Sequence, residues 1–330
     1  MNRISITRSR RAAIAMGVAL GATFAVGSVQ AADPWPSRPL KIIVPYPPGG
    51  SSDIIARSIS QPLSEALKQP VIVENRPGAN GNLGADLVAK GPTDGYTVLL
   101  CDVGALSISP SVYTKLSFDP SKDLRGVTML AYSPHLLVVH PSVKANNLQE
   151  LVALSKKEDL NFAVTASGSA PHLAGVALQR AVGAKWVYVP YKGGSQSISD
   201  TVAGQTQILM NGMLATLPFV QSQKLKILAV SKGTRMPMIG DVPTIAEQGV
   251  PGFESGTWQG VMASRNTPDA VIQKLNAELI RVIRSPEVRS RLAGQGAEVV
   301  TMAPTELEGF FNKERARWAK VVKEADIRLD

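Results

Sequence analysis

The stretch Ile43-Val44-Pro45-Tyr46-Pro47-Pro48-Gly49-Gly50-Ser51-Ser52-Asp53 joins a strand, a loop and a helix within eleven positions. Its β-branched start predicts a buried strand, and the two prolines and two glycines at 47–50 exclude regular structure there. Apolar residues then recur every four positions from Ile55 to Leu67, which indicates a helix. Ser51 or Ser52 can cap that helix, and Asp53 suits the positive end of its dipole. Pro62 should kink or split it.

The same alternation continues along the chain. We expect helices at 81–89, at 148–156 and from about 171, and strands at 71–73, 97–100, 136–139, 161–164, 186–189, 207–210 and 226–230. Strands that alternate with helices predict parallel sheets covered on both faces. After residue 263 the pattern is helical to the end, and Thr267-Pro268-Asp269 is a helix start with Thr as cap. Leu307, Phe310, Phe311, Trp318 and Val321 then mark an apolar face that we interpret as core.

The first 31 residues have the composition of a secretory signal peptide. Four arginines precede the apolar run 12–26, and Val29-Gln30-Ala31 offers small residues for cleavage. The alternative of an uncleaved anchor needs about 20 apolar residues. Ser9-Arg10-Arg11 leaves twin-arginine export open beside the general secretory route. We therefore predict a periplasmic protein whose fold begins after residue 31.

Charge and cysteine content exclude some classes of protein. The formal net charge of +9 includes the four arginines of the leader, and the other basic residues are scattered among acids. Without a dense basic run or interleaved aromatic residues, nucleic-acid binding is a poor explanation. The one cysteine, Cys101, excludes an intramolecular disulfide. A chain of 330 residues is long enough for two domains.

Catalytic and cofactor signatures are missing from the sequence. The three histidines are not at metal-ligand spacing, and there is no Gly-x-Ser-x-Gly elbow. The glycine-rich stretch 78–84 has the wrong spacing for a dinucleotide fingerprint and no lysine for a P-loop. We therefore expect neither an enzyme nor a bound metal or cofactor.

One structural motif recurs three times: a strand, a loop of small polar residues and a helix start. It occurs at 47–53, at 165–172 and at 190–195. Such loops present unpaired backbone N–H groups at the positive end of a helix dipole, which binds an anion well. In open parallel sheets these loops meet at the carboxyl ends of the strands, where ligands bind. The sequence therefore predicts capture of an anion.

Short motifs are distributed along the whole mature chain. They are Pro36-Ser37-Arg38-Pro39, Ile43-Val44-Pro45-Tyr46-Pro47-Pro48-Gly49-Gly50 with Asp53, Val73-Glu74-Asn75-Arg76-Pro77-Gly78-Ala79, Gly81-Asn82 with Gly84-Ala85, Asp94-Gly95-Tyr96-Thr97, Pro110-Ser111 with Tyr113, Val139-His140-Pro141-Ser142, His172-Leu173-Ala174-Gly175, Val189-Pro190-Tyr191-Lys192-Gly193, Asp241-Val242-Pro243-Thr244 and Trp318-Ala319-Lys320-Val321. With these motifs the chain resembles the tripartite tricarboxylate transporter substrate-binding proteins, also called the Bug (Bordetella uptake gene) family.

The resemblance implies a type II periplasmic binding protein fold, an α/β fold of two lobes joined by a hinge, with the ligand cleft between them. We expect residues 32–133 and 256–330 to form lobe 1 and residues 134–255 to form lobe 2. It also implies a monomer that delivers a small carboxylate to a transporter of one large and one small membrane subunit. A partner of a sensor kinase and a periplasmic hydrolase remain alternatives.

Ligand-binding residues are carried over from the family motifs. They are Tyr46, Pro48, Gly49, Gly50, Ser51 and Ser52 in the first loop, and Ser167, Gly168, Ser169, Ala170 and His172 with Tyr191 and Asn211 opposite. We expect Asp53 to hold the loop through backbone N–H groups rather than to touch the ligand. His172 has two possible roles: it pairs with a carboxylate, or neighbouring backbone satisfies it.

Three departures from the family pattern bear on the ligand. Asp102 replaces a small hydroxyl residue, Ala166 and Pro171 alter the second loop, and Asn211 stands where an acid is common. The loss of that acid weakens the case for an amino acid, whose ammonium needs a carboxylate. Asp102 restores one if it faces the cleft. Otherwise a dicarboxylate or an aromatic carboxylate is favoured, with Tyr46 and Tyr191 available for ring contact.

Overall fold

A computed structural model describes residues 35–325 and 327–329. The predicted signal peptide, residues 1–31, lies outside these ranges. Within them, no helix combines the length and the apolar character that crossing a bilayer requires.

The strands form one mixed sheet in the order β2-β1-β3-β9-β4-β7-β5-β6, and β10 and β8 also pair with β4. Their bounds are Leu40–Val44 (β1), Val71–Asn75 (β2), Thr97–Asp102 (β3), Leu124–Val139 (β4), Asn161–Val164 (β5), Val187–Pro190 (β6), Ile208–Gly212 (β7), Lys226–Val230 (β8), Gly256–Ser264 (β9) and Glu298–Val299 (β10). All the strands expected from the sequence are present, and β4 extends twelve residues before the predicted start at 136.

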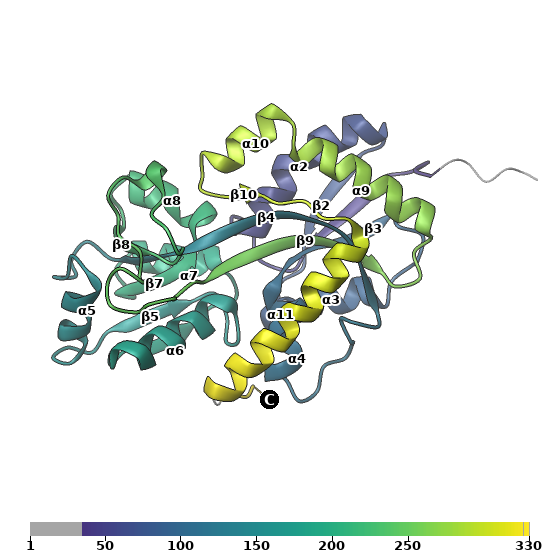
Figure 1. Cartoon of the computed structure of the whole chain (residues 1–330). Coiled ribbons are helices and arrows are strands. Elements are labelled where there is room, and N and C mark those ends of the chain that lie inside the picture. The colour runs from purple at the N-terminus through teal and green to yellow at the C-terminus, as the bar shows by residue number, and fades with distance from the viewer. Residues whose placement is uncertain (1–34, 326, 330) are drawn as a thin grey trace, which may run out of the picture. The chain divides into compact units, whose positions relative to one another are not determined.

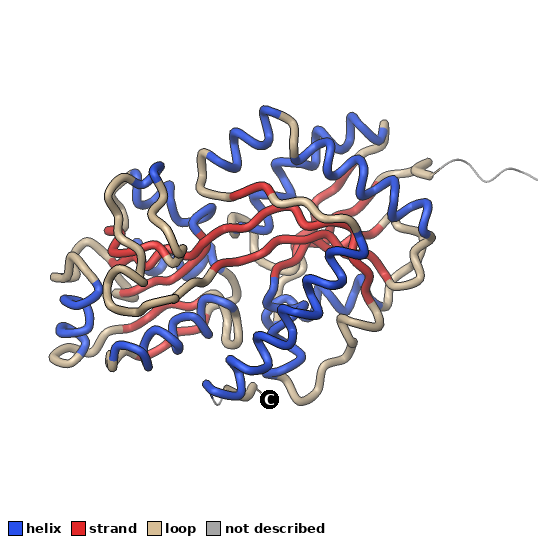
Figure 2. Tube along the Cα trace, in the orientation of Figure 1, coloured by secondary structure: helices blue, strands red, loops and turns tan. Residues whose placement is uncertain are grey.

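Helices lie on both sides of the strands (Figure 2). Their bounds are Ser51–Leu67 (α2), Asn82–Ala89 (α3), Ser109–Val112 (α4), Leu148–Ser155 (α5), Ala170–Val182 (α6), Gly194–Val202 (α7), Met213–Gln221 (α8), Asp269–Ile283 (α9), Pro286–Ala293 (α10) and Pro304–Ala325 (α11). Three shorter helical segments are Ala79–Gly81 (η1), Gly104–Ile108 (η2) and Pro237–Ile239 (η3).

The sheet divides into two parallel parts that give the protein its two lobes. In the first lobe β1 pairs in parallel with β2 and β3, and in the second β5 pairs in parallel with β6 and β7. The strands between them, β9 and β4, pair antiparallel with their neighbours, so the expectation of purely parallel sheets is wrong there. β4 exchanges its partner β9 for β7 between Pro134 and His135, and both strands run from one lobe into the other (Figure 1). The lobe boundaries given above stay a prediction.

Separate apolar clusters support the two lobes and their junction. The second lobe packs Phe162, which is fully buried, against Trp186 with ring centroids 5.3 Å apart. Trp318 and Val322 of α11 pack against Leu173 of α6, which belongs to the second lobe. The predicted apolar face is therefore core, since Leu307, Phe311 and Trp318 of α11 are buried.

Four local expectations from the sequence differ from the structure. Gly50 is the cap residue of α2, and no side chain bonds to its free N–H groups, so neither Ser51 nor Ser52 caps it. Helix α2 continues unbroken through Pro62. Helix α9 begins at Asp269 with Pro268 as cap, one position later than expected. β10 interrupts the helical C-terminal region, because Glu298 and Val299 pair with Tyr132 and Ala131 of β4.

Candidate functional site

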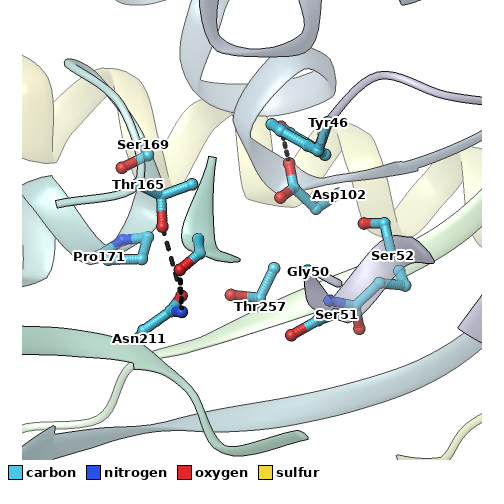
Figure 3. Close-up of a pocket in the computed structure, with 12 residues that line it drawn as sticks. Tyr46, Gly50, Ser51, Ser52, Asp102, Thr165, Ser169, Pro171, Asn211 and Thr257 are labelled. Carbon is cyan, nitrogen blue, oxygen red and sulfur yellow. Dashed lines mark hydrogen bonds between the residues drawn. The ribbon is translucent and has the colours of Figure 1, made fainter. Parts of the chain in front are cut away.

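A cavity lies between the two lobes, where several strands end and helices begin. Its lining residues come from both lobes and from β9, and they are Tyr46, Gly50, Ser51, Ser52, Asp102, Thr165, Ser169, Pro171, Gly194, Asn211, Thr257 and Gln259. Figure 3 shows Thr165, Ser169 and Asn211 on one side, Tyr46, Asp102 and Ser52 on the other, and Thr257 between them.

The structure brings half of the predicted binding residues to this cavity. Lining it are Tyr46, Gly50, Ser51, Ser52, Asp102, Ser169 and Asn211. Ser167 and Tyr191 line a separate opening beside it, together with Asn80 and Lys192. Pro48, Gly49, Gly168, Ala170 and His172 belong to the predicted loops but not to the lining of the cavity. A ligand-binding role for any of these residues remains a proposal.

The start of α2 presents free backbone donors beside the cavity. The first N–H groups of a helix have no intrahelical acceptor, and at the start of α2 no side chain accepts a hydrogen bond from them. Ser51 and Ser52, the first two residues of α2, line the cavity. The helix is 17 residues long, so its dipole adds a partial positive charge at this end.

Asp53 holds the loop before α2, as expected from the sequence. Its carboxylate accepts the N–H of Gly49 at 2.9 Å, the amide of Asn75 at 2.8 Å and the guanidinium of Arg57 at 3.0 Å. Burial alone would raise the pKa of Asp53, but these bonds outweigh it, and the pKa lies below its usual value. The acid therefore faces its own loop, and it fixes the direction of the α2 N–H groups.

In the corresponding loop of the second lobe, the polar groups form hydrogen bonds with one another. Ser169 caps α6 by accepting the N–H of His172, and its hydroxyl donates to the carbonyl of Ala166 at 2.7 Å. Pro171 has no N–H to offer. The start of α6 therefore presents fewer free donors than the sequence suggests.

His172 takes the second of its two predicted roles. Its Nδ1 accepts the N–H of Gly168 at 3.0 Å, and its ring lies edge-on to Tyr188. Burial lowers the pKa of His172 to about 4, so the imidazole is neutral. A neutral ring that already accepts a backbone bond holds the loop and offers no charge to an anion.

Glycines let the second lobe approach the first. Gly194, the first residue of α7, lines the cavity beside Asn211, and a Cβ added to it would lie 2.8 Å from Nδ2 of that residue. At Gly193 an added Cβ would lie 2.3 Å from Cδ of Pro47, which belongs to the other lobe. The lobes are also joined by a bond from Asn80 Nδ2 to the carbonyl of Gly168, 3.1 Å long. The interlobe fit therefore depends on glycine at 193.

Asp102 closes the end of the cavity on the first lobe. The hydroxyl of Tyr46 donates to its Oδ1 at 2.6 Å, and the N–H of Gly104 donates to the same atom at 2.8 Å. Burial raises the pKa of Asp102 to about 6 and places the pKa of Tyr46 well above its usual value. Because Asp102 is one of the residues that line the cavity, it faces the cleft, a question that the sequence left open.

Five lining residues were not among those predicted. Thr165, Pro171 and Gly194 lie in loops that the sequence did single out, whereas Thr257 and Gln259 lie on β9. The sequence could have pointed to Thr257 and Gln259, because they are polar residues at alternate positions of a strand that is otherwise apolar or small. This spacing places both side chains on one face of the sheet.

The described residues contain no cluster of His, Cys, Asp or Glu that could hold a metal ion.

Residues 55–327 match the model of the tripartite tricarboxylate transporter family receptors. The chain belongs to this family. Its members are receptors and not enzymes, and the Bug proteins are among them.

Three solved structures share the fold of this family receptor. The periplasmic binding protein BugD is 32% identical with a TM-score of 0.86, and the match covers 89% of this chain and 99% of BugD. An R. palustris protein solved with adipate is 33% identical with a TM-score of 0.87, over 89% of this chain and 99% of that one. MatC from Rhodopseudomonas palustris, with bound malate, is 32% identical with a TM-score of 0.83, over 87% and 100%. The fold is therefore that of the two-lobed periplasmic binding proteins.

Proposed function

We propose that the chain is a periplasmic receptor that captures a small carboxylate and delivers it to a tripartite tricarboxylate-type transporter. The observation that carries the proposal is the uncapped start of α2, which opens into a cavity between two lobes. Helix N–H groups bind carboxylate oxygens without a cationic side chain. Two relatives were solved with dicarboxylates, adipate and malate, which supports this class of ligand.

Membership of a family of transporter receptors supports the proposed delivery to a large and a small membrane subunit. The periplasmic location is supported by the predicted signal peptide and by the periplasmic relative BugD. In such a receptor the ligand favours the closed arrangement of the lobes, because it touches both of them only when they are closed. We expect the monomer to be the functional unit.

Within the carboxylates, the cavity favours an aliphatic ligand over an aromatic one. Tyr191, which was expected to contact a ring, lines the neighbouring opening instead. Tyr46 is the one aromatic side chain among the 12 described residues that line the cavity, and its hydroxyl is bonded to Asp102. A thermal-shift screen of the mature protein against mono-, di- and tricarboxylates, aromatic acids, sugars and metal ions tests the class. A ligand at about 100 times its Kd adds roughly 2.7 kcal/mol of stability.

The substitution Ser51→Pro tests the donor role of the α2 start. Ser51 is the first residue of α2, where proline fits a helix and removes only the N–H. Hydrogen bonds to charged groups contribute about 1.5–3 kcal/mol, so we expect the affinity for the carboxylate found in the screen to be weaker by at least about tenfold, measured by isothermal titration calorimetry. Ser51→Ala keeps the N–H and should bind within about threefold of the wild type. Equal affinities in all three proteins would place the anion elsewhere.

A further inference from the structure

Asp102 and Gln259 face each other across two paired strands. The antiparallel register of β3 and β9 places Asp102 directly opposite Gln259. Directly opposed residues have Cβ atoms about 4.5–5.5 Å apart and lie on the same face of the sheet. Both line the cavity, and Thr257 lies two positions before Gln259 on that face. The first lobe therefore ends the cavity with a carboxyl group and an amide side by side.

The amide of Gln259 has no partner within the described protein. Its side chain is fully buried, and neither Nε2 nor Oε1 makes a hydrogen bond. Leaving a buried polar group unpaired costs about 1–3 kcal/mol, so such groups are rare and call for an explanation. Because Gln259 lines the cavity, a ligand bound there is in a position to supply the missing partner.

The carboxyl group of Asp102 has spare capacity as an acceptor. Its two bonds, from Tyr46 and Gly104, both end on Oδ1, which leaves Oδ2 for a ligand. None of the 12 described residues that line the cavity is Lys, Arg or His. An ionised carboxylate enclosed without a cation is unfavourable, and a cation from the ligand removes that cost.

We propose that Asp102 and Gln259 form an ammonium-binding end of the cavity, so that the captured solute is a carboxylate that also carries an ammonium group. The proposal rests on the proposed function, which places the carboxylate at the start of α2. Oδ2 of Asp102 and Oε1 of Gln259 accept ammonium N–H groups, while the opposite charge of the ligand meets the α2 dipole.

The state of the carboxyl group supports this assignment. Burial raises the pKa of Asp102 to about 6, so the group is ionised near neutral pH and titrates just below it. The neighbouring titratable groups, Tyr46 and Cys101, have pKa values well above their usual ones and stay neutral. Asp53 on α2 remains ionised, since its pKa is lowered. The other residues on this side, Ser51 and Ser52 of α2 and Thr257 of β9, do not titrate in this range. Affinity for an ammonium ligand therefore falls as the pH drops through about 6.

The test uses triplets of acids that share a skeleton and differ in one group. They are propionate, lactate and alanine; succinate, malate and aspartate; and phenylpropionate, phenyllactate and phenylalanine. Each is titrated calorimetrically into the wild type and into Asp102→Asn, which keeps Oδ1 for Tyr46 and Gly104. Asp86→Asn, on the outer side of α3 and paired with Lys90, is the control.

We expect the wild type to bind the ammonium member of at least one triplet most tightly. Asp102→Asn should weaken that member at least about thirtyfold and leave its hydroxy and unsubstituted partners within about threefold. The pH dependence should disappear in Asp102→Asn and persist in Asp86→Asn. If Asp102→Asn does not fold, the wild type alone tests the proposal. The ammonium acid should then bind most tightly within a triplet near neutral pH and lose this preference below about pH 6.

Tighter binding of the hydroxy or unsubstituted acids by the wild type overturns the ammonium proposal and leaves carboxylate capture intact. The same conclusion follows if Asp102→Asn binds the ammonium acid with the affinity of the wild type. Binding of sugars or metal ions without any carboxylate overturns both proposals.

Discussion

Replacing Gly193 with valine is expected to lower ligand affinity by about tenfold to a hundredfold without unfolding the protein. A Cβ at this position would lie 2.3 Å from Cδ of Pro47, an atom of a rigid ring in the opposite lobe. The backbone at Gly193 is extended, with φ of 177°, so valine strains neither the chain nor the lobe that carries it. The added side chain therefore acts only on the approach of the lobes. Overpacking of this kind costs about 1–3 kcal/mol or more, and each 1.4 kcal/mol is a factor of ten in affinity.

The control adds the same side chain where it meets nothing. Gly309 is exposed on α11, and no atom lies within 4 Å of a Cβ built there, so Gly309→Val should bind normally. Calorimetry gives the affinities, and small-angle scattering reports whether the ligand compacts each protein. Thermal unfolding without ligand should give melting temperatures for Gly193→Val and the wild type within a few degrees of each other. Normal binding by Gly193→Val would mean that the lobes need not meet at Pro47.

The first loop could be predicted from the sequence because its features are local. Two prolines and two glycines end the strand, and the apolar spacing that follows sets the helix, so the place of Ser51 and Ser52 at a helix start requires no tertiary information. The same holds for Asp53, whose bond to Gly49 spans only four residues.

What the sequence did not reveal depends on contacts between distant segments. β4 runs for 16 residues because β9, more than a hundred positions later, pairs along its first part. On its other side β9 pairs with β3, which brings Gln259 opposite Asp102, and no local pattern links these two residues. The second loop shows the reverse case: Ser169 lies where expected, but its hydroxyl is bonded to Ala166. A small polar residue in a loop thus indicates a place near the site, while its availability depends on the backbone around it.

Asp53→Ala is expected to lower both stability and ligand affinity, because one carboxylate organises the start of α2. The side chain is 4% exposed, and its removal leaves the N–H of Gly49 and one of the two amide N–H groups of Asn75 without an acceptor, while the other still donates to the carbonyl of Tyr46. Each such loss costs about 1–3 kcal/mol, so the free energy of unfolding should fall by about 2–4 kcal/mol. Denaturant unfolding and calorimetry on the same samples measure the two effects. Asp86→Ala, which removes the carboxylate that pairs with Lys90 at the surface, should cost less than about 1 kcal/mol and bind normally.

The pH dependence separates Asp53 from Asp102, because their pKa values are shifted in opposite directions. The pKa of Asp53 is lowered, so its stabilising contribution is present above the usual carboxyl pKa near 4 and is lost as the pH falls below it. The pKa of Asp102 is raised to about 6, so the folded state without ligand gains stability as the pH falls from about 7 towards 4. The difference in stability between the wild type and Asp53→Ala should therefore stay constant from about pH 7 to 5 and shrink below about pH 4. A difference that shrinks already at pH 6 would show that the carboxyl group of Asp53 is not the one held by Gly49, Asn75 and Arg57.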